Sequence, residues 1–236
     1  MRVLISVTNL KEAIDALSAD ADIIDVKNPL EGALGANFPW VLINVKKHVG
    51  EKAEVSATLG DLPYLPGTTS LAALGAASCG VDYVKVGLFG PRSLREAFRM
   101  VKVVSKSLKG YRSKVIAAGY ADYFKYGCVN PLKLPKCVAS ANGAGILIDV
   151  KEKNEKSLFH YCSFDQLKKF VKEAHDYGLI VALAGHLGGN DVAKVYELGA
   201  DIIGVRRSVC KMVDNGRLKL DRDLMKKFIE AVRRFK

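Results

Sequence analysis

The feature that most constrains the fold of this chain is a pattern that occurs eight times, a short β-branched apolar run followed by a longer amphipathic segment. The apolar runs occupy residues 2–7, 23–26, 54–58, 83–86, 114–118, 146–149, 179–184 and 202–205. The amphipathic segments, with helical spacing, occupy residues 10–18, 40–48, 70–79, 93–109, 131–141, 163–177, 191–198 and 221–234. Strands that alternate with helices in this way predict an α/β protein with a parallel sheet.

Eight such units in 236 residues predict a parallel (β/α)8 barrel, the TIM barrel, which typically takes about 250 residues. A doubly wound open sheet is the structural alternative. It usually has fewer strands, and when it binds a dinucleotide it carries a glycine-rich turn after its first strand. The corresponding turn here, residues 6–10, contains no glycine. We therefore predict one TIM-barrel catalytic domain over residues 1–236.

The composition indicates a folded chain, since 49% of the residues are apolar. No apolar stretch reaches the roughly 20 residues that cross a bilayer, and the first residues lack the features of a signal peptide. We therefore expect a cytoplasmic protein with no membrane partner. The five cysteines and four histidines form no metal-binding spacing, so no metal site is predicted.

The formal charge of +11 is compatible with nucleic-acid binding or with attraction of small anions such as sugar phosphates. The basic residues are spread over the helical segments 93–109 and 221–236, where they alternate with apolar residues. This distribution favours solvated helix faces and small phosphorylated ligands over a nucleic-acid partner. The apolar helix faces are also compatible with a homo-oligomer.

Charged residues stand where several of the predicted strands end, which is the active-site face of a TIM barrel. Asp25 and Lys27 end the second strand, Lys85 ends the fourth and Asp149 ends the sixth. Because side chains alternate along a strand, Asp25 and Lys27 share one face, and all four residues are expected to point into the barrel. Strands two, four and six fill common layers of a barrel interior, so Lys27, Lys85 and Asp149 are expected to converge.

Converging lysines predict carbonyl chemistry. Neighbouring cations and burial lower the pKa of a lysine, which leaves a neutral amine able to attack a carbonyl and form an imine. A second lysine nearby then moves protons, and Asp25 orients one of the ammonium groups. The alternative is structural, because a lysine at a strand end often reaches solvent and an aspartate often caps a loop. That alternative weakens when several buried charges cluster, since burying unpaired charge is costly.

A second signal follows the seventh and eighth strands, where glycine-rich turns expose backbone N–H groups. Barrels of this fold often bind phosphate between these two loops, and ordinary turn chemistry is the alternative explanation. The predicted phosphate-binding residues are Gly185, His186, Gly204 and Arg206, and Arg207 adds positive charge.

Five segments resemble a known family, the (5-formylfuran-3-yl)methyl phosphate synthases, which make the furan precursor of methanofuran. The segments are residues 25–40, which begin Asp-Val-Lys-Asn-Pro, and residues 55–61, 83–87, 117–122 and 182–185. The resemblance runs from the first strand to the eighth. It implies a barrel similar to class I aldolases that condenses two molecules of glyceraldehyde 3-phosphate, with loss of phosphate and water.

The resemblance also implies roles for particular residues. Lys27 matches the Schiff-base lysine of the family, Lys85 the proton acceptor and Asp25 a supporting group. In the sixth unit the chain keeps the family's spacing of an aspartate and a lysine, here Asp149 and Lys153, although the residues around them differ. His186 stands where the family has a small hydroxyl residue. The implied activity is that of a carbon–oxygen lyase acting on phosphates that requires no metal or organic cofactor.

Two other functions fit the same residues. One is a class I aldolase that acts on a different sugar phosphate. The other is a non-catalytic basic barrel that binds RNA or a partner protein, in which Lys27 and Lys85 would form no imine.

Overall fold

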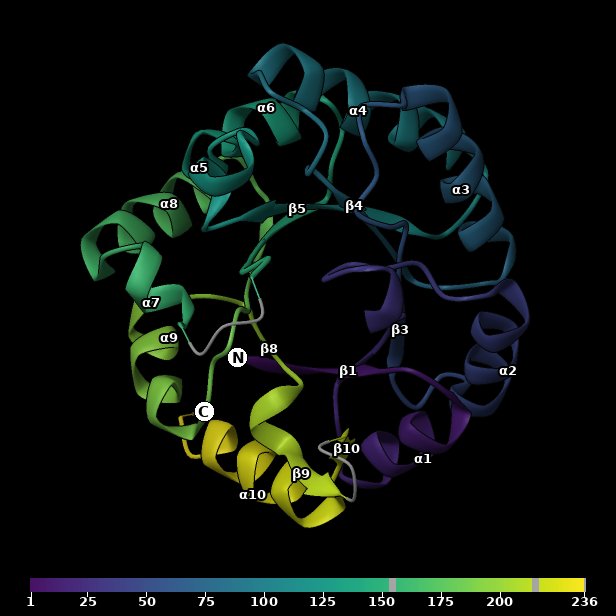
Figure 1. Ribbon diagram of the computed structural model, residues 1–236, viewed down its shortest axis with the longest axis vertical. Helices are drawn as coiled ribbons and strands as arrows, with labels where there is room; N and C mark the ends of the chain where they lie inside the picture. The colour runs from purple at the N-terminus through teal and green to yellow at the C-terminus, as the bar shows by residue number, and fades with distance from the viewer. Residues whose placement is uncertain (153–155, 214–216, 236) are drawn as a thin grey trace.

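The computed structural model describes residues 1–152, 156–213 and 217–235, which form a closed parallel barrel surrounded by helices (Figure 1). The barrel strands are β1 (Arg2–Val7), β2 (Ile23–Val26), β3 (Glu54–Thr58), β4 (Tyr83–Gly87), β5 (Lys114–Tyr120), β6 (Gly145–Asp149), β7 (Ile180–Leu183) and β8 (Ile202–Val205). They pair in chain order, and β8 closes the barrel against β1. The predicted TIM barrel is confirmed, and the open doubly wound sheet is excluded.

The helices lie outside this ring. They are α1 (Leu10–Ser18), α2 (Pro39–Val49), α3 (Pro66–Ser78), α4 (Leu94–Ser107), α5 (Tyr123–Tyr126), α6 (Pro135–Ser140), α7 (Leu158–Tyr161), α8 (Phe164–Asp176), α9 (Val192–Leu198) and α10 (Arg222–Arg233). Short 3₁₀ turns add η1 (Pro29–Glu31), η2 (Pro131–Lys133), η3 (Gly189–Asp191) and η4 (Arg207–Val209). The two short helices α5 and α7 were not predicted from the sequence, because one helical turn leaves little periodic signal.

The predicted helix over residues 131–141 is wrong in one respect, since the segment divides into η2 and α6. Pro135 lacks a backbone N–H and its ring crowds the preceding turn, so a helix running through it would lose a hydrogen bond. As the first residue of α6, Pro135 instead occupies the position at which proline suits a helix.

The core has two parts, which follow from the alternation of side chains along each strand. Residues such as Ile5 and Val84 point outward and pack between the strands and the helices. A second cluster fills the barrel interior and includes Leu4 and Leu147. The loop after β2 adds Ala33 and Leu34 to this interior cluster, and Leu34 has no exposed surface. This loop is therefore part of the core as well as part of the barrel mouth.

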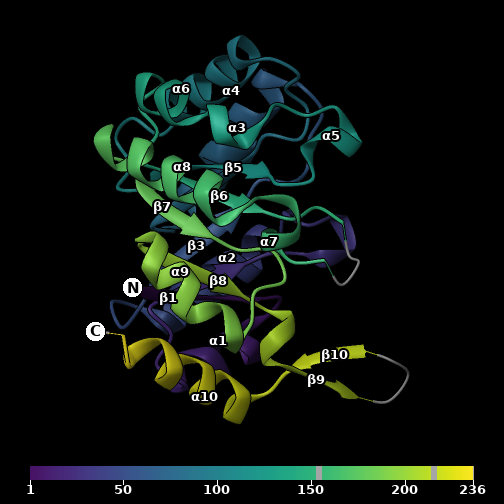
Figure 2. The same cartoon turned by 90° about the vertical axis from the view of Figure 1, so that its left-hand side faces the viewer.

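After β8 the chain forms a hairpin of two strands, β9 (Cys210–Val213) and β10 (Arg217–Leu220), before α10. Figure 2 shows the hairpin projecting from the side of the barrel on which the barrel strands end. Cys210 and Leu218 from the hairpin line the cavity at this end. This hairpin was not predicted from the sequence.

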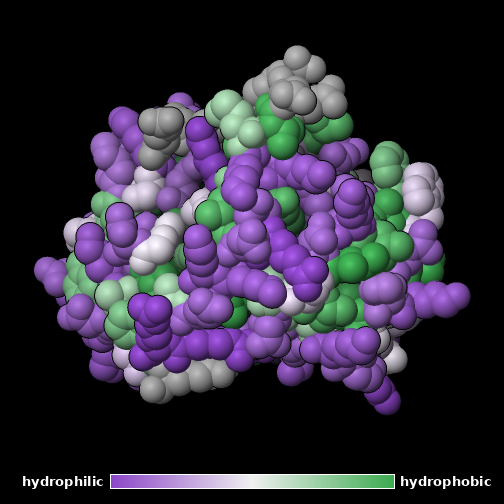
Figure 3. Space-filling model, turned by 90° about the horizontal axis from the view of Figure 1, so that it is seen from below, coloured by the Kyte–Doolittle hydropathy of each residue, from purple (hydrophilic) through white to green (hydrophobic). Residues whose placement is uncertain are grey.

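The face formed by α10 and α1 is mainly hydrophilic (Figure 3). Arg222, Lys226 and Lys227 of α10 are exposed, while Met225 and Phe228 on the opposite side of the helix are buried. The basic residues of this helix thus form a solvated face, as its pattern predicts. None of the helices in the described part of the chain has the length and apolar character that a membrane crossing requires.

Candidate active site

A cavity of about 400 Å³ opens where the barrel strands end. Its walls come from β1, β2, β4, β6 and β8, from the loops after β2, β6, β7 and β8, and from the hairpin of β9 and β10. The charged residues in its lining are Asp25, Lys27, Lys85, Asp149, Arg206 and Arg207. The predicted convergence of Lys27, Lys85 and Asp149 is confirmed, because all three line this one cavity.

The Asp25 carboxylate is the most tightly held charge in the site. Strand register places Ser6, Asp25 and Ser56 side by side on β1, β2 and β3. The Ser6 hydroxyl donates to Asp25 Oδ2 at 3.0 Å, and the Ser56 hydroxyl donates to Oδ1. Lys85 Nζ lies 2.6 Å from Oδ1 and completes a buried ion pair. Asp25 is therefore fixed from three strands and oriented toward Lys85.

The two partners of this ion pair both have shifted pKa values. Burial alone would raise the pKa of Asp25, but the charges of Lys85 and Lys27 and the hydrogen bonds from Lys85 and Ser56 lower it. Burial lowers the pKa of Lys85, and the charge of Lys27 lowers it further, against the opposing effect of Asp25. The site thus favours an ionised carboxylate beside an amine that loses its proton more easily than an ordinary lysine.

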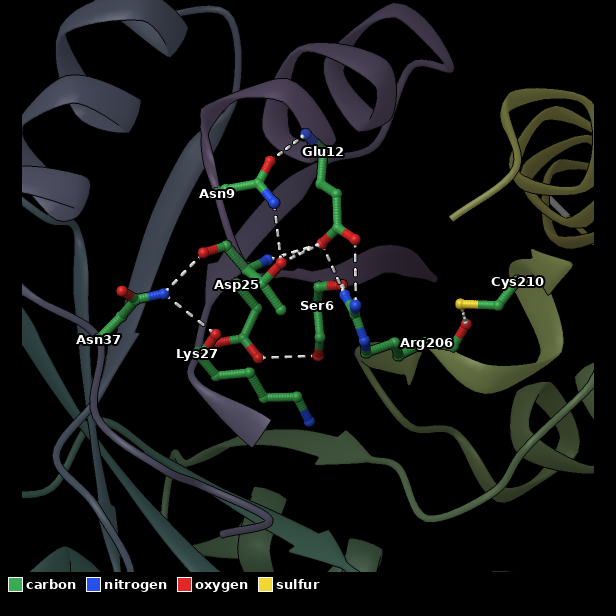
Figure 4. A network of polar contacts seen from close by, with 9 residues as sticks. Ser6, Asn9, Glu12, Asp25, Lys27, Asn37, Arg206 and Cys210 are labelled. Atoms are coloured by element: carbon green, nitrogen blue, oxygen red, sulfur yellow. Dashed lines mark hydrogen bonds and ion pairs between the residues drawn. The ribbon is translucent and has the colours of Figure 1, made fainter. Parts of the chain in front are cut away.

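Lys27 follows β2 directly and is 9% exposed. Its Nζ donates to the carbonyl oxygen of Ala33 at 3.3 Å, within the loop after β2. The Asn37 side-chain amide donates to the carbonyls of Lys27 and Thr8, at 3.2 and 2.9 Å, which ties the end of β2 to the end of β1. Figure 4 shows the two contacts of Asn37, with the Lys27 side chain extending alongside the Asp25 carboxylate. Both the backbone and the amine of Lys27 are therefore held in place.

Asp149 ends β6, and its Oδ1 accepts the backbone N–H of Val150 at 2.7 Å. Its negative charge favours the protonated form of Lys85 and so opposes the lowering of that pKa. Lys153, the other predicted residue of this unit, lies outside the described residues. Within the described chain, no group of three or more His, Cys, Asp and Glu side chains is arranged to hold a metal ion.

The predicted phosphate loops also reach the mouth of the barrel. Gly185, His186 and Gly204 line the main cavity, and His186 Nε2 lies 3.0 Å from the carbonyl oxygen of Glu152. A second cavity, of about 370 Å³, adjoins it. Its walls are residues 186–191 of the loop after β7, together with Arg207 and Ser208 after β8. The loops after β7 and β8 therefore line a polar space beside the cavity that contains the lysines.

Position 185 requires glycine for two reasons, its backbone conformation and the lack of space for a side chain. Its φ is +98°, in the region that favours glycine, and an added Cβ would lie 2.6 Å from Val150 Cγ2. The close approach brings the loop after β7 against the end of β6, so the two loops share a wall of the cavity.

Arg206 makes an ion pair with Glu12 that was not predicted from the sequence. Its guanidinium donates to both carboxylate oxygens of Glu12, at 2.9 and 3.1 Å, and to the carbonyl oxygen of Ser6 at 2.7 Å. Glu12 also accepts the backbone N–H and the hydroxyl of Thr8. These contacts join the loop after β8 to α1 and β1 (Figure 4). The charge of Arg206 is thus matched by Glu12. Arg207 lines both cavities.

We expect Glu12→Gln to destabilise the protein, because it replaces a charged bidentate partner of Arg206 in a partly buried position. The expected loss is about 2 kcal/mol, which corresponds to a fall in melting temperature of roughly 4–8 °C for a chain of this size. Thermal unfolding of both proteins measures this difference. Asp176→Asn is the control, since it breaks the exposed Lys172–Asp176 pair and should change stability by less than about 0.5 kcal/mol. If both substitutions lowered the melting temperature equally, the Glu12–Arg206 pair would contribute no more to stability than an exposed ion pair does.

Sequence reasoning missed Ser6 and Ser56, which hold Asp25. A signal for them exists in the alternation of side chains, because each is a hydroxyl residue at an inward-facing position of its strand. Serine is common in strands, so this signal becomes informative only when Asp25 is known to lie between Ser6 and Ser56.

The fold and the cavity define a class of protein: a TIM barrel with a charged cavity at the carboxyl ends of its strands, where enzymes of this fold have their active sites. The solved structure of phosphoribosyl anthranilate isomerase from Thermus thermophilus is similar, with a TM-score of 0.65 and both chains covered completely (100%). Sequence identity to it is 16%, so this likeness concerns the fold alone.

The family follows from sequence similarity. The profile of the 4-HFC-P synthase family matches residues 3–229. The chain is 48% identical to the (5-formylfuran-3-yl)methyl phosphate synthase of Archaeoglobus fulgidus, with 98% of this chain and 99% of the relative covered. It is 45% identical to the protein of the same name from Methanopyrus kandleri, with 98% of each covered. The chain belongs to the 4-HFC-P synthase family, and the resemblance found in its motifs is confirmed.

Proposed function

We propose that this protein is a (5-formylfuran-3-yl)methyl phosphate synthase that acts in methanofuran biosynthesis. In this proposal it is a lyase that condenses two molecules of glyceraldehyde 3-phosphate, with loss of phosphate and water, through a Schiff base on Lys27. The observation that carries the proposal is the buried Asp25–Lys85 ion pair next to Lys27, within one cavity of a chain that belongs to this family.

The first step is attack of the neutral Lys27 amine on the aldehyde carbon of one triose phosphate. A C–N bond forms, the carbonyl oxygen leaves as water, and the resulting iminium ion acidifies the neighbouring C–H. Lys85 accepts that proton, which leaves an enamine. Elimination of phosphate from this enamine breaks the C3–O bond and leaves an enol, whose C3 attacks the C2 carbonyl of the second triose phosphate after isomerisation of that molecule to the ketone. The C1 hydroxyl of the second triose then closes the ring onto C2 of the first, loss of two waters gives the aromatic furan, and hydrolysis of the imine frees Lys27.

Asp25 keeps Lys85 in position for this proton transfer. Its carboxylate is fixed by Ser6 and Ser56, so the ion pair directs the Lys85 amine toward one place in the cavity. Asp149 and Lys153 are proposed to assist later proton transfers, since Asp149 lines the opposite wall.

The phosphate groups of the substrates are proposed to bind at the loops after β7 and β8. Gly185, His186 and Gly204 line the side of the cavity that adjoins the polar space described above. Arg206 and Arg207 are proposed to supply guanidinium donors on this side, with the charge of Arg206 matched by Glu12. Charge-assisted hydrogen bonds to a phosphate are stronger than neutral ones, which suits a substrate that must be held through several steps.

The test is incubation of the pure protein with glyceraldehyde 3-phosphate, followed by mass spectrometry and absorbance measurements for the furan product. Borohydride added to a parallel sample reduces an imine to a stable amine, and peptide mass spectrometry locates it. Furan formation and an adduct on Lys27 support the proposal. An adduct without furan would favour a class I aldolase for another sugar phosphate. If no adduct and no product form, the protein is a binding barrel.

The Asp25–Lys85 pair also predicts a shift in pH dependence. Asp25 raises the pKa of Lys85, so Asp25→Asn removes that effect while burial and the Lys27 charge continue to lower it. The acid limb of the kcat/KM profile, which reports on the free enzyme, is therefore expected to move to lower pH. Asp149→Asn should move it in the same direction by less, because Asp149 has the smaller effect on Lys85. An unchanged limb, or a shift to higher pH, would contradict the assignment of Lys85 as the base.

A further inference from the structure

A buried polar cluster beside the cavity has no part in the steps above. The Tyr120 hydroxyl donates to Asp61 Oδ1, and Lys151 Nζ lies 2.7 Å from Asp61 Oδ2. The side chain of Asp61 is 5% exposed and that of Lys151 is 17% exposed. Burial and the charge of Asp61 raise the pKa of Tyr120 well above its usual value, so the phenol remains a neutral donor. We refer to Asp61, Tyr120 and Lys151 as the loop clamp.

The loop clamp joins several of the loops that surround the mouth of the barrel. Asp61 follows β3, Tyr120 ends β5 and Lys151 follows β6. Lys151 Nζ also lies 4.8 Å from the centre of the Phe89 ring, in the loop after β4, and that ring packs edge-on against Tyr120. The backbone of Lys151 is held in turn, because its N–H donates to the buried carboxylate of Asp122 at 2.9 Å. Four consecutive units of the barrel therefore meet at this cluster.

Asp61 also reaches the loop after β2, which holds the Lys27 amine. Its Oδ2 accepts the backbone N–H of Leu34 at 3.4 Å. The carboxylate packs so closely against Gly32 that a Cβ at that position would overlap it. Ala33, between these two contacts, presents the carbonyl oxygen that accepts the hydrogen bond from Lys27 Nζ. The position of the Ala33 carbonyl thus depends on the position of Asp61.

The direction of the Lys27 amine matters for attack on a carbonyl. A neutral amine has one lone pair, and an N–H donated to Ala33 leaves that lone pair pointing in a limited set of directions. Misplacement of a reacting group by about 1 Å can lower a rate by about 100-fold. A lysine side chain has several rotatable bonds, so an anchor for its terminal nitrogen has a large effect on where the lone pair points.

We propose that the loop clamp is a positioning device for Lys27. By holding residues 32–34 from the far side, Asp61 fixes the Ala33 carbonyl, and the carbonyl aims the amine into the cavity. Lys151 and Tyr120 fix Asp61 and connect it to the loop after β6, which follows Asp149. The inference rests on the proposed imine at Lys27 and adds positioning residues to that reaction.

The experiment compares Asp61→Asn, Lys151→Met and Tyr120→Phe with the wild-type protein. The measurements are kcat and KM for glyceraldehyde 3-phosphate and the rate at which borohydride traps an adduct on Lys27. We expect Asp61→Asn to lower kcat and the trapping rate together, by about 100-fold, since both depend on the aim of the amine. KM should change little, because the phosphate-binding loops are not altered. Tyr120→Phe and Lys151→Met should show smaller losses with the same pattern, by roughly 10-fold.

Asp82→Asn is the matched control. Asp82 also pairs with a lysine, Lys46, at 2.8 Å and accepts a backbone N–H, that of Val55, but it precedes β4 at the opposite end of the barrel. Thermal unfolding should show a loss of stability for both aspartate variants, with kcat and trapping unchanged for Asp82→Asn.

The possible outcomes separate the two proposals. If Asp61→Asn lowers the melting temperature but traps the adduct at the wild-type rate, the loop clamp has only a structural role and the inference is wrong. If Asp61→Asn does not fold, the same comparison of melting temperature and trapping rate is made with Tyr120→Phe. This variant should fold, because it removes one hydrogen bond at nearly constant volume. If the wild-type protein forms no adduct on Lys27, the proposed function itself fails.

Discussion

Lys27→Ala is expected to lose furan synthesis by a factor on the order of 10⁴ to 10⁶, the range seen when the nucleophile of a covalent mechanism is removed. Without the amine no imine forms, so borohydride should trap no adduct on the protein at any substrate concentration. The fold should survive, because alanine fits the space of the lysine stem and leaves the Asp25–Lys85 pair intact. Product analysis, adduct mapping and thermal unfolding of the same preparation measure the three effects.

The control for Lys27 is Lys172→Ala, which removes an exposed lysine on α8 and should leave activity unchanged. A Lys27→Ala protein that still yields a reduced adduct would show that another lysine carries the imine. In that case the peptide that bears the adduct identifies the lysine, and Lys85 is the first to examine, since burial lowers its pKa.

Lys85→Met is expected to lower kcat by about 10²- to 10⁴-fold, the usual contribution of a positioned acid or base. Lys27 keeps its amine in this variant, so the imine should still form and be trapped by borohydride. Trapping without turnover is the signature that separates a proton acceptor from a nucleophile. Loss of both trapping and turnover would mean that Lys85 acts before the imine forms.

Lys85→Met should also alter the pH dependence of stability. In the wild-type protein the pKa of Asp25 is lowered, so its contribution to stability is present above the ordinary carboxyl pKa of about 3.9 and is lost as the pH falls through the lower, folded-state value. In the variant the carboxylate is buried without its ion-pair partner, at an expected loss of about 3–5 kcal/mol near neutral pH. Because burial then raises the pKa of Asp25, this loss should shrink as the pH falls and the group is protonated.

Urea unfolding at several pH values measures both effects: as the pH falls, the wild-type protein should lose the stability that Asp25 contributes, whereas the deficit of Lys85→Met should shrink. The double variant Lys85→Met, Asp25→Asn should regain part of the stability without regaining activity, since it removes the unpaired charge along with the base. A single variant as stable as the wild-type protein at neutral pH would show that Asp25 does not depend on Lys85.

Much of the fold was predictable because each barrel unit combines two local patterns, a short apolar run and a helical stripe. Predicted strands such as 2–7 and 54–58 coincide with β1 and β3. The divided segment around Pro135 and the hairpin of β9 and β10 were not predicted. The hairpin strands have four residues each and lie outside the barrel core, so they lack the buried alternation that marks a strand in a sequence.

Which side chains face the cavity was also predictable, since alternation along a strand fixes the facing of Asp25, Lys27 and Lys85. Which residues pair with one another was not. Arg206 meets Glu12 across 194 positions of the chain, and Lys151 meets Asp61 across 90. Such ion pairs depend on how loops from different units pack against each other, and no local sequence pattern predicts that packing.

The burial of Leu34 implies that the loops of this barrel differ in how well they tolerate substitution. Leu34 belongs to the loop after β2, yet it has no exposed surface and packs in the barrel interior. An exchange of that loop for a sequence from another barrel is therefore also a core substitution, and it risks the fold together with the reaction. The loop after β7 is anchored through Leu187, which packs in the cluster between strands and helices, but its tip at Gly189 and Asn190 is exposed, and Gly189 has open space around it. New substrate ranges, in evolution or by design, should therefore arise more readily from changes at the tip of the loop after β7 than from changes in the loop after β2.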